Sequence, residues 1–209
     1  KQIFKDIYNS IETLISLIGD YVDISKFKLR RLEASLKRVT IGSMEEKIRK
    51  KVKVHQGFSE EERVKVTYSS SILETQKKQI TLADLPRLIR VIDNLVQNAI
   101  DYTPEKGKVH IETSVTANTF LFQVSDTGIG IPKQDKNKVF SEFFRSINAR
   151  KLKSTGSGIG LFLASMVIKA HKGKIWFDSE ENKGTTFHFQ IPLYQQASAE
   201  NLEEFLRKV

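Results

Sequence analysis

The chain has 209 residues, of which 39% are hydrophobic and 28% charged, a balance typical of a globular protein with one sizeable core. It contains no cysteine, which excludes disulfides and thiolate-bound metals. The formal net charge of +9 is compatible with nucleic acid, membrane surfaces or phosphorylated ligands as partners. Because no basic stripe with interleaved aromatic residues is present, we favour a lysine-rich solvated surface and expect no nucleic-acid partner.

No apolar run approaches the roughly 20 residues that a membrane-spanning helix needs, and we recognise no signal-peptide pattern in the first residues of this sequence. Because the chain starts at Lys1 without a methionine, we interpret it as part of a longer protein. The expected location is the cytoplasm, and residues before Lys1 leave room for an anchor in the inner membrane.

The first segment has the pattern of an amphipathic helix. Its apolar residues recur at spacings of three and four and form a seam along one face: Phe4, Ile7, Ile11, Leu14, Ile18 and Tyr21. We expect this helix to run to about Arg38 and to pair with a second copy of the chain in a homodimeric helical bundle. The alternative is a helix that packs on its own domain.

A new helix is predicted after the sequence "TIGS", with Ser43 as its N-cap, and we place a domain boundary there. Strands are expected at 64–70 and 79–82. Asp84 is then expected to cap a helix over 85–102. Pro86 does not contradict this helix, because proline is tolerated in the first turn.

The second half of the chain alternates hairpins with short helices. The runs "KVHIETSV" and "TFLFQVSD" predict one β-hairpin, and "KIWFDSE" with "TTFHFQIPL" predicts another. Between them we expect a short helix over 136–143, a polar loop over 145–155 and a helix over 158–171 that Gly173 ends. A short helix is expected in the tail, 195–209. This order indicates an α+β fold, a two-layer α/β sandwich with helices on one face of a mixed, mostly antiparallel sheet.

Two asparagines interrupt the apolar pattern of the predicted helix over 85–102. Asn94 and Asn98 are four residues apart, so both amides lie on one helix face. Amide oxygens suit Mg²⁺, a hard cation that often bridges phosphates. The alternative for such a pair is an ordinary polar surface.

A single carboxylate stands at the end of a predicted strand, in the sequence "SDTGIGIP". An ionised Asp126 there can accept a hydrogen bond from the exocyclic amine of adenine, whereas guanine presents a carbonyl oxygen at that position. A hydrogen bond to a charged group is worth about 1.5–3 kcal/mol, which is enough to favour ATP over GTP. The alternative is an Asp-Thr-Gly turn without a ligand.

A glycine-rich sequence, "STGSGIGLFLA", opens the predicted helix over 158–171. Free N–H groups at a helix start can bind an anion. The spacing differs from the dinucleotide-binding fingerprint, and the lysine of a P-loop is missing. A flexible helix start without a ligand would have the same sequence.

Together these motifs follow one order: "NLVQNAIDYTP", "DTGIGIP", "VFSEFFR", "GSGIGLFLA" and "GTTFHFQIP". That order resembles the ATP-binding catalytic domain of sensor histidine kinases, part of the GHKL superfamily with gyrase B, Hsp90 and MutL. The resemblance is close over 83–193 and implies a Bergerat-type fold. The N-terminal "LISLIGDYVDISKF" is similar to the second helix of that family's dimerisation and phosphotransfer hairpin. The implied domains are this helix at 1–40, the catalytic domain at 43–194 and a tail at 195–209 without an assigned role.

The resemblance implies roles for single residues. Asn98 would coordinate the Mg²⁺ that bridges the phosphates, and Asn94 would line the phosphate site. Tyr102 would stack on adenine, Asp126 would bind its amine, and Thr185 would support Asp126 through a water molecule.

The glycine motifs and the loop after them also receive roles from the resemblance. Gly128 and Gly130 would let the chain pass close to the base, and Arg145 would reach a phosphate. The loop over 145–155 would be a mobile lid. The remaining phosphates would be cradled by the backbone of the second glycine motif: Gly156, Gly158, Ile159, Gly160 and Leu161.

Two positions bear on activity. Gyrase-type and MutL-type ATPases have a glutamate base four residues before the magnesium asparagine, where this chain has Asn94, and an amide cannot accept a proton at neutral pH. Transfer to an external nucleophile therefore fits better than hydrolysis. Histidine kinases often have a lysine just before the stacking tyrosine, where this chain has Asp101. This carboxylate would weaken nucleotide binding unless it points to solvent.

The four histidines, His55, His110, His171 and His188, lack the sequence of a phosphoacceptor and are expected to be ordinary surface residues. The acceptor is expected upstream of Lys1, so no catalytic residue is assigned on this chain. The resemblance thus implies a histidine-kinase fragment that binds Mg-ATP for phosphoryl transfer to an absent histidine, and from there to a response-regulator aspartate. The alternative is a nucleotide-binding pseudokinase scaffold that signals by conformation or partner binding.

Overall fold

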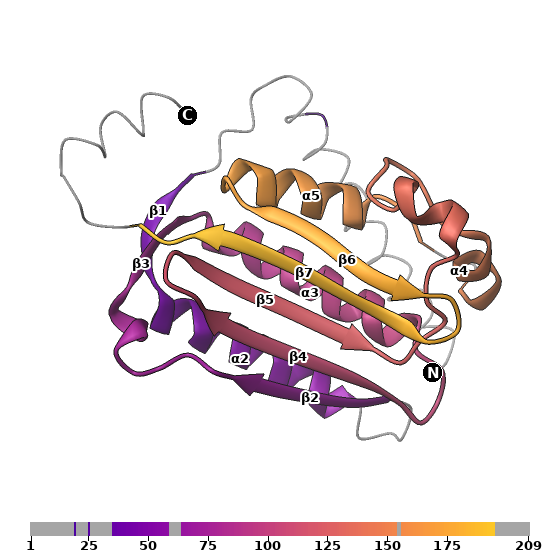
Figure 1. The fold of residues 1–209 in the computed structure, drawn as a ribbon, viewed down its shortest axis with the longest axis horizontal. Coiled ribbons are helices and arrows are strands. Elements are labelled where there is room, and N and C mark those ends of the chain that lie inside the picture. Colours follow the sequence, from indigo (N-terminus) through magenta and orange to yellow (C-terminus); the bar gives the residue numbers. More distant parts are fainter. Residues whose placement is uncertain (1–18, 20–24, 26–34, 59–63, 154–155, 195–209) are drawn as a thin grey trace, which may run out of the picture.

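The computed structural model describes residues 19, 25, 35–58, 64–153 and 156–194. In the described part of the chain the longer helices lie on one face of a twisted sheet, which is seen from its open face in Figure 1. The helices are α2 (Ile41–Phe58), α3 (Leu85–Asp101), α4 (Ile147–Leu152) and α5 (Gly160–Ala170), with 3₁₀ turns at Gln76–Lys78 and Lys133–Lys138. The strands are β1 (Lys37–Thr40), β2 (Val64–Ser70), β3 (Ile80–Ala83), β4 (Gly107–Val115), β5 (Thr119–Asp126), β6 (Lys174–Glu180) and β7 (Gly184–Pro192).

The main sheet has the strand order β2-β4-β5-β7-β6. Adjacent strands of this sheet pair antiparallel, except β2 and β4, which pair parallel. This confirms the predicted two-layer α+β sandwich with a mixed, mostly antiparallel sheet. Because β5 pairs with β7 with Ser125 opposite Thr186, the end of β5 meets the start of β7. This register brings Asp126 beside Thr185, although the two residues lie far apart in the sequence.

The core lies between the sheet and the helices. Along β5, alternate residues Phe120, Phe122 and Val124 are fully buried, as the alternating sequence pattern predicts. Phe122 stacks on Phe189 of β7, with ring centroids 5.1 Å apart. The apolar face of α3 closes the core from the other side with Leu85, Leu88, Val91, Ile92, Leu95, Val96 and Ala99. Its opposite, polar face is therefore available for a site.

Helix α3 begins where the sequence predicts. The carboxylate of Asp84 accepts a hydrogen bond from the backbone N–H of Arg87, which is the expected N-cap contact. The backbone N–H of Asp84 donates to Nε2 of His171, at 2.9 Å. His171 ends α5, so this bond fastens the start of α3 to the end of α5.

The first described segments differ from the sequence prediction. Gly19 and Ser25 are helical, and the rest of the apolar seam over 4–21 lies outside the described residues. Residues 37 and 38, expected in that helix, belong to β1, which pairs antiparallel with β3. Helix α2 starts at Ile41, and the hydroxyl of Thr40, not that of Ser43, accepts the capping bond from the N–H of Ser43. The cap was misplaced because either residue suits that position.

Three short elements were also misplaced. The segment predicted as a helix over 136–143 forms a 3₁₀ turn at Lys133–Lys138, and Phe143 has a φ of 60°. The predicted loop over 145–155 contains α4, and α5 starts at Gly160 instead of residue 158. After α5 the left-handed position is Lys172, with a φ of 55°, and not Gly173. The helical tail expected at 195–209 lies outside the described residues.

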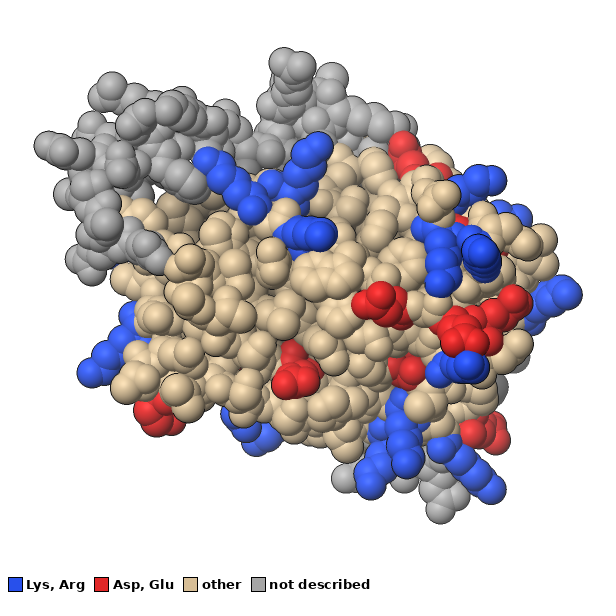
Figure 2. Space-filling view, viewed as in Figure 1, with Lys and Arg blue, Asp and Glu red and all other residues tan. Residues whose placement is uncertain are grey.

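The open face of the sheet carries its basic side chains mostly toward the rim, with several at the end near α4 (Figure 2). The middle of this face is mostly uncharged but carries scattered acidic side chains. Among the described residues, no helix has the length and apolar character needed to cross a membrane.

Candidate nucleotide site

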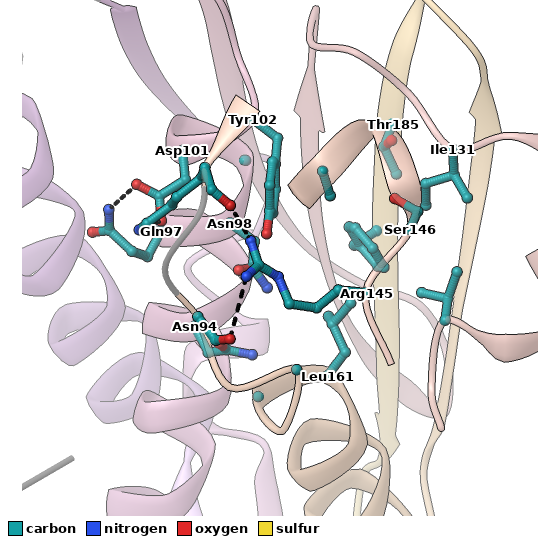
Figure 3. A pocket seen from close by; sticks show the side chains of 18 of the residues that line it. Asn94, Gln97, Asn98, Asp101, Tyr102, Ile131, Arg145, Ser146, Leu161 and Thr185 are labelled. Carbon is teal, nitrogen blue, oxygen red and sulfur yellow. Dashed lines mark hydrogen bonds and ion pairs between the residues drawn. The ribbon is translucent and has the colours of Figure 1, made fainter. Parts of the chain in front are cut away.

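A cavity of about 750 Å³ lies between the polar face of α3, the turn after β5, the segment around α4 and the start of α5. Figure 3 shows Asn94, Asn98 and Tyr102 along one side, Arg145 in the centre, and Thr185 and Ile131 opposite. Eleven of the thirteen predicted site residues line it: Asn94, Asn98, Tyr102, Asp126, Gly130, Arg145, Gly156, Gly158, Gly160, Leu161 and Thr185. Residues from all five sequence motifs therefore meet in one cavity.

Asp126 is fixed at one end of this cavity. Its Oδ1 accepts hydrogen bonds from the backbone N–H groups of Gly128, at 2.8 Å, and Thr185, at 3.1 Å. Burial raises the pKa of Asp126 to about 6, and the two N–H donors partly oppose that shift. The carboxylate is thus held in one orientation before any ligand binds.

Thr185 supports Asp126 directly through its backbone. Its hydroxyl instead lies 2.9 Å from Oγ of Ser179. Ser179 also accepts a hydrogen bond from the N–H of Ile131, at 2.9 Å, so it joins the turn after β5 to the β6–β7 hairpin. No local sequence pattern indicates Ser179, because its role depends on the pairing of two strands. The water-mediated contact of Thr185 stays a prediction.

The turn after β5 passes close to the end of α3. A Cβ atom on Gly128 would lie 2.3 Å from the backbone oxygen of Tyr102, so only glycine fits without a shift. That same oxygen accepts a hydrogen bond from the N–H of Ile129, at 3.1 Å. Gly128 does not line the cavity; it allows the close approach that places Asp126 and Tyr102 on the same wall.

The opposite end of the cavity is formed by Asn94 and the start of α5. The Nδ2 atom of Asn94 is buried and has no hydrogen-bond partner among the described residues. A Cβ atom on Gly160 would lie 2.3 Å from Oδ1 of Asn94. The glycine at the helix start therefore leaves space for this amide, and a buried donor without a partner is costly unless a ligand accepts from it. Ile159 is buried next to Gly160 and does not line the cavity.

The predicted lid is held across the cavity by its own contacts. The Arg145 guanidinium donates to the backbone oxygens of Lys153 and Gly156, which bracket the end of the lid. At the other end, Nδ2 of Asn148 donates to the backbone oxygen of Gly130, at 3.0 Å. Asn148 has no role in the sequence prediction, which places a polar loop where α4 forms.

Asp101 does not point to solvent. Its Oδ2 pairs with Nζ of Lys153 at 2.6 Å, and its Oδ1 accepts a hydrogen bond from Gln97, at 3.0 Å. Its side chain is 19% exposed, and Asp101, Gln97 and Lys153 all line the cavity. The lysine that pairs with this carboxylate is 52 residues away in the sequence, so no local pattern indicates the pair.

The fold and this cavity together define a GHKL-type ATP-binding domain. Residues 83–195 match the family model of the histidine kinase-, DNA gyrase B- and HSP90-like ATPases. The chain belongs to this family and carries the ATP-binding domain of a sensor histidine kinase.

Similar proteins agree with this assignment. The sensor histidine kinase WalK of Bacillus subtilis (strain 168) is 33% identical over 199 residues, which cover 94% of this chain and 31% of WalK. The nucleotide-free catalytic domain of the histidine kinase ThkA is 30% identical with a TM-score of 0.62, covering 76% of this chain and 95% of that domain. Full-length ShkA in complex with AMPPNP is 25% identical with a TM-score of 0.71, and the match covers 91% of this chain and 38% of the ShkA chain. The chain spans about a third of the curated relatives' length.

Proposed function

We propose that this chain binds Mg-ATP in the cavity and positions the γ-phosphoryl group for transfer to a histidine on another helix. In that transfer a bond forms between an imidazole nitrogen and the γ-phosphorus, the bond from the γ-phosphorus to the bridging oxygen breaks, and ADP leaves. The phosphoryl group would then pass to an aspartate of a response regulator. The observation that carries the proposal is that one cavity joins the fixed carboxylate of Asp126 to the buried Nδ2 of Asn94, which has no hydrogen-bond partner among the described residues.

The two ends of the cavity fit the two ends of ATP. Asp126 presents an acceptor whose direction is set by two backbone N–H groups, as the exocyclic amine of adenine requires. The Tyr102 ring stands along the wall near that end, in a position to stack on the base (Figure 3). At the other end the Asn94 amide and the N–H groups that open α5 offer donors to phosphate oxygens.

The residues present also fit Mg²⁺. The Asn98 side chain faces the cavity one helical turn from Asn94 and offers the hard oxygen ligand that Mg²⁺ prefers. Bound there with the phosphates, the ion would neutralise the charge that develops during transfer. Asn94 supplies no base for an attacking water, so the chain's own residues bind and orient the nucleotide without activating hydrolysis.

A calorimetric titration with a non-hydrolysable ATP analogue tests the proposal. We expect binding that strengthens about tenfold or more when Mg²⁺ is present, because the ion offsets repulsion between the phosphates and connects them to Asn98. GTP serves as the matched control ligand, since its base presents a carbonyl oxygen to Asp126. Equal affinity for both nucleotides, or no binding, would contradict the proposal.

We expect the chain not to phosphorylate itself, because each of its histidines already has a structural partner. His171 is buried, which corrects the expectation of a surface residue, and it bonds to two backbone groups. His55 lies 2.7 Å from Asp93, His110 lies 2.9 Å from the hydroxyl of Thr67, and His188 stacks on Trp176.

Incubation with γ-³²P-ATP followed by alkaline gel analysis measures whether the chain phosphorylates itself. The chain alone is expected to stay unlabelled, whereas a separate phosphoacceptor helix added with it becomes labelled. Stable label on any of the four histidines would contradict the first expectation. A chain that binds ATP yet never labels the added helix would favour the scaffold alternative.

The partners of the full protein belong to the same proposal. The solved complex of ThkA with the response regulator TrrA, in which ThkA is 25% identical to this chain with a TM-score of 0.66, supports a receiver domain as the next phosphoryl acceptor. Homodimerisation through residues 1–40 stays a prediction, as do the domain limits at 43 and 194.

A further inference from the structure

The ion pair between Asp101 and Lys153 stands at the wall of the nucleotide cavity. Asp101 follows Asn98 by three residues on α3, so the two side chains lie on neighbouring positions of one helix face. Asp101 therefore places a carboxylate beside the asparagines that would face the phosphates of the proposed nucleotide. A part-buried negative charge at that position opposes a polyphosphate unless it is neutralised.

Lys153 reaches Asp101 because the lid segment is folded over the cavity. Arg145 donates to the backbone oxygen of Lys153, and α4 is tied to the turn after β5 through Asn148. The Lys153 Nζ atom then lies 2.6 Å from Oδ2 of Asp101, and Gln97 holds the other carboxylate oxygen. The lysine, the carboxylate and the amide form one connected group on the cavity wall.

We propose that Lys153 is a specificity-determining residue whose role is to neutralise Asp101, so that the cavity accepts a polyphosphate. Lys153 and Asp101 act as a compensated pair: neither charge is needed for binding, but an unpaired Asp101 is harmful. This inference rests on the proposed function and concerns the phosphates only. Adenosine, which has no phosphate, should bind independently of the pair.

The size of the effect follows from Coulomb's law at short range. Two like charges about 7 Å apart, at the effective dielectric constant of a protein site, repel enough to weaken binding about 10- to 100-fold. Salt screens such a pair only partly when it is part-buried. The loss on removing Lys153 should therefore be large for ATP and persist at moderate ionic strength.

A cycle of variants in this chain, titrated with a non-hydrolysable ATP analogue and with adenosine, tests the pair. Lys153→Gln is expected to lose affinity for the ATP analogue by about 10-fold or more and to keep its affinity for adenosine. Asp101→Asn should bind the analogue at least as tightly as the unaltered chain. The double variant Asp101→Asn with Lys153→Gln should recover the affinity that Lys153→Gln loses.

The exposed lid residue Lys151 provides the matched control, since Lys151→Gln removes the same charge two residues away. It should change the affinity less than about twofold. A double variant as weak as Lys153→Gln would overturn the inference, because Lys153 would then contact the phosphates itself. Equal losses for Lys151→Gln and Lys153→Gln would also overturn it. If the unaltered chain binds adenosine and ATP but no variant differs, only this inference fails; if it binds neither, the proposed function fails as well.

Discussion

Replacing Asp126 with asparagine is expected to weaken binding of an ATP analogue on the order of 100-fold, the value of a lost charged hydrogen bond. The asparagine Oδ1 can still accept from the N–H groups of Gly128 and Thr185, so the turn keeps its shape. The new amide NH₂ would then face the amine of adenine, donor against donor. Calorimetric titration of the variant and the unaltered chain measures the difference.

Asp126→Asn should also make the nucleotide-free protein more stable at neutral pH. The pKa of Asp126 is raised to about 6 from 3.8, so the folded state binds the proton more tightly than the unfolded state. The free energy of unfolding therefore falls as the pH rises through this window, by about 3 kcal/mol in total. Asparagine, which stays neutral, avoids this loss.

Urea unfolding of the Asp126→Asn variant and the unaltered chain measures this difference in the free energy of unfolding. At pH 7 the Asp126→Asn variant should be the more stable by about 2–3 kcal/mol, and the difference should vanish below about pH 3, where Asp126 is protonated in both states. Binding of the ATP analogue to the unaltered chain should weaken as the pH falls below about 6. A variant that is less stable at pH 7 and binds ATP normally would refute both the pKa shift and the role of this carboxylate.

Adding one methyl group at Gly128, which lies outside the cavity lining, is expected to lower both the stability of the protein and its affinity for the ATP analogue. In Gly128→Ala the new Cβ atom would lie 2.3 Å from the backbone oxygen of Tyr102 and 2.7 Å from Oδ1 of Asp126. Backbone atoms cannot swing aside as a long side chain can, so the turn or the end of α3 must move. We expect a loss of about 1–3 kcal/mol in the free energy of unfolding, typical of overpacking, and loss of measurable binding of the ATP analogue because Asp126 is displaced.

The matched control is Gly42→Ala in α2, where the new Cβ atom would lie 3.2 Å from Cβ of Lys77. There alanine favours the helix by up to about 1 kcal/mol, which offsets the tight contact. Urea unfolding and calorimetry of both variants measure stability and binding together. If Gly128→Ala bound the analogue as well as Gly42→Ala does, the close approach of the turn to α3 would have no role in placing Asp126.

Most long elements could be predicted from local sequence, because their signals are local. Strand β2 occupies the predicted range 64–70, and Asp84 caps α3 as expected, since alternation and capping depend on residues a few positions apart. The errors fall on short elements such as β1 and α4. A four-residue strand exists only through its partner, here β3, and no local pattern records that partner.

The sequence by itself determined the chemical parts of the candidate site. An asparagine pair at helical spacing, a carboxylate at a strand end and glycines at a helix start could each be recognised in place, because each depends on its own neighbours. Only the tertiary structure decided how they combine. The register of β5 against β7 gives Asp126 a second N–H from Thr185, and the packing of the segment that ends α4 against α3 pairs Asp101 with Lys153. Such contacts join residues more than 50 positions apart, and their geometry is set by packing, which no local pattern encodes.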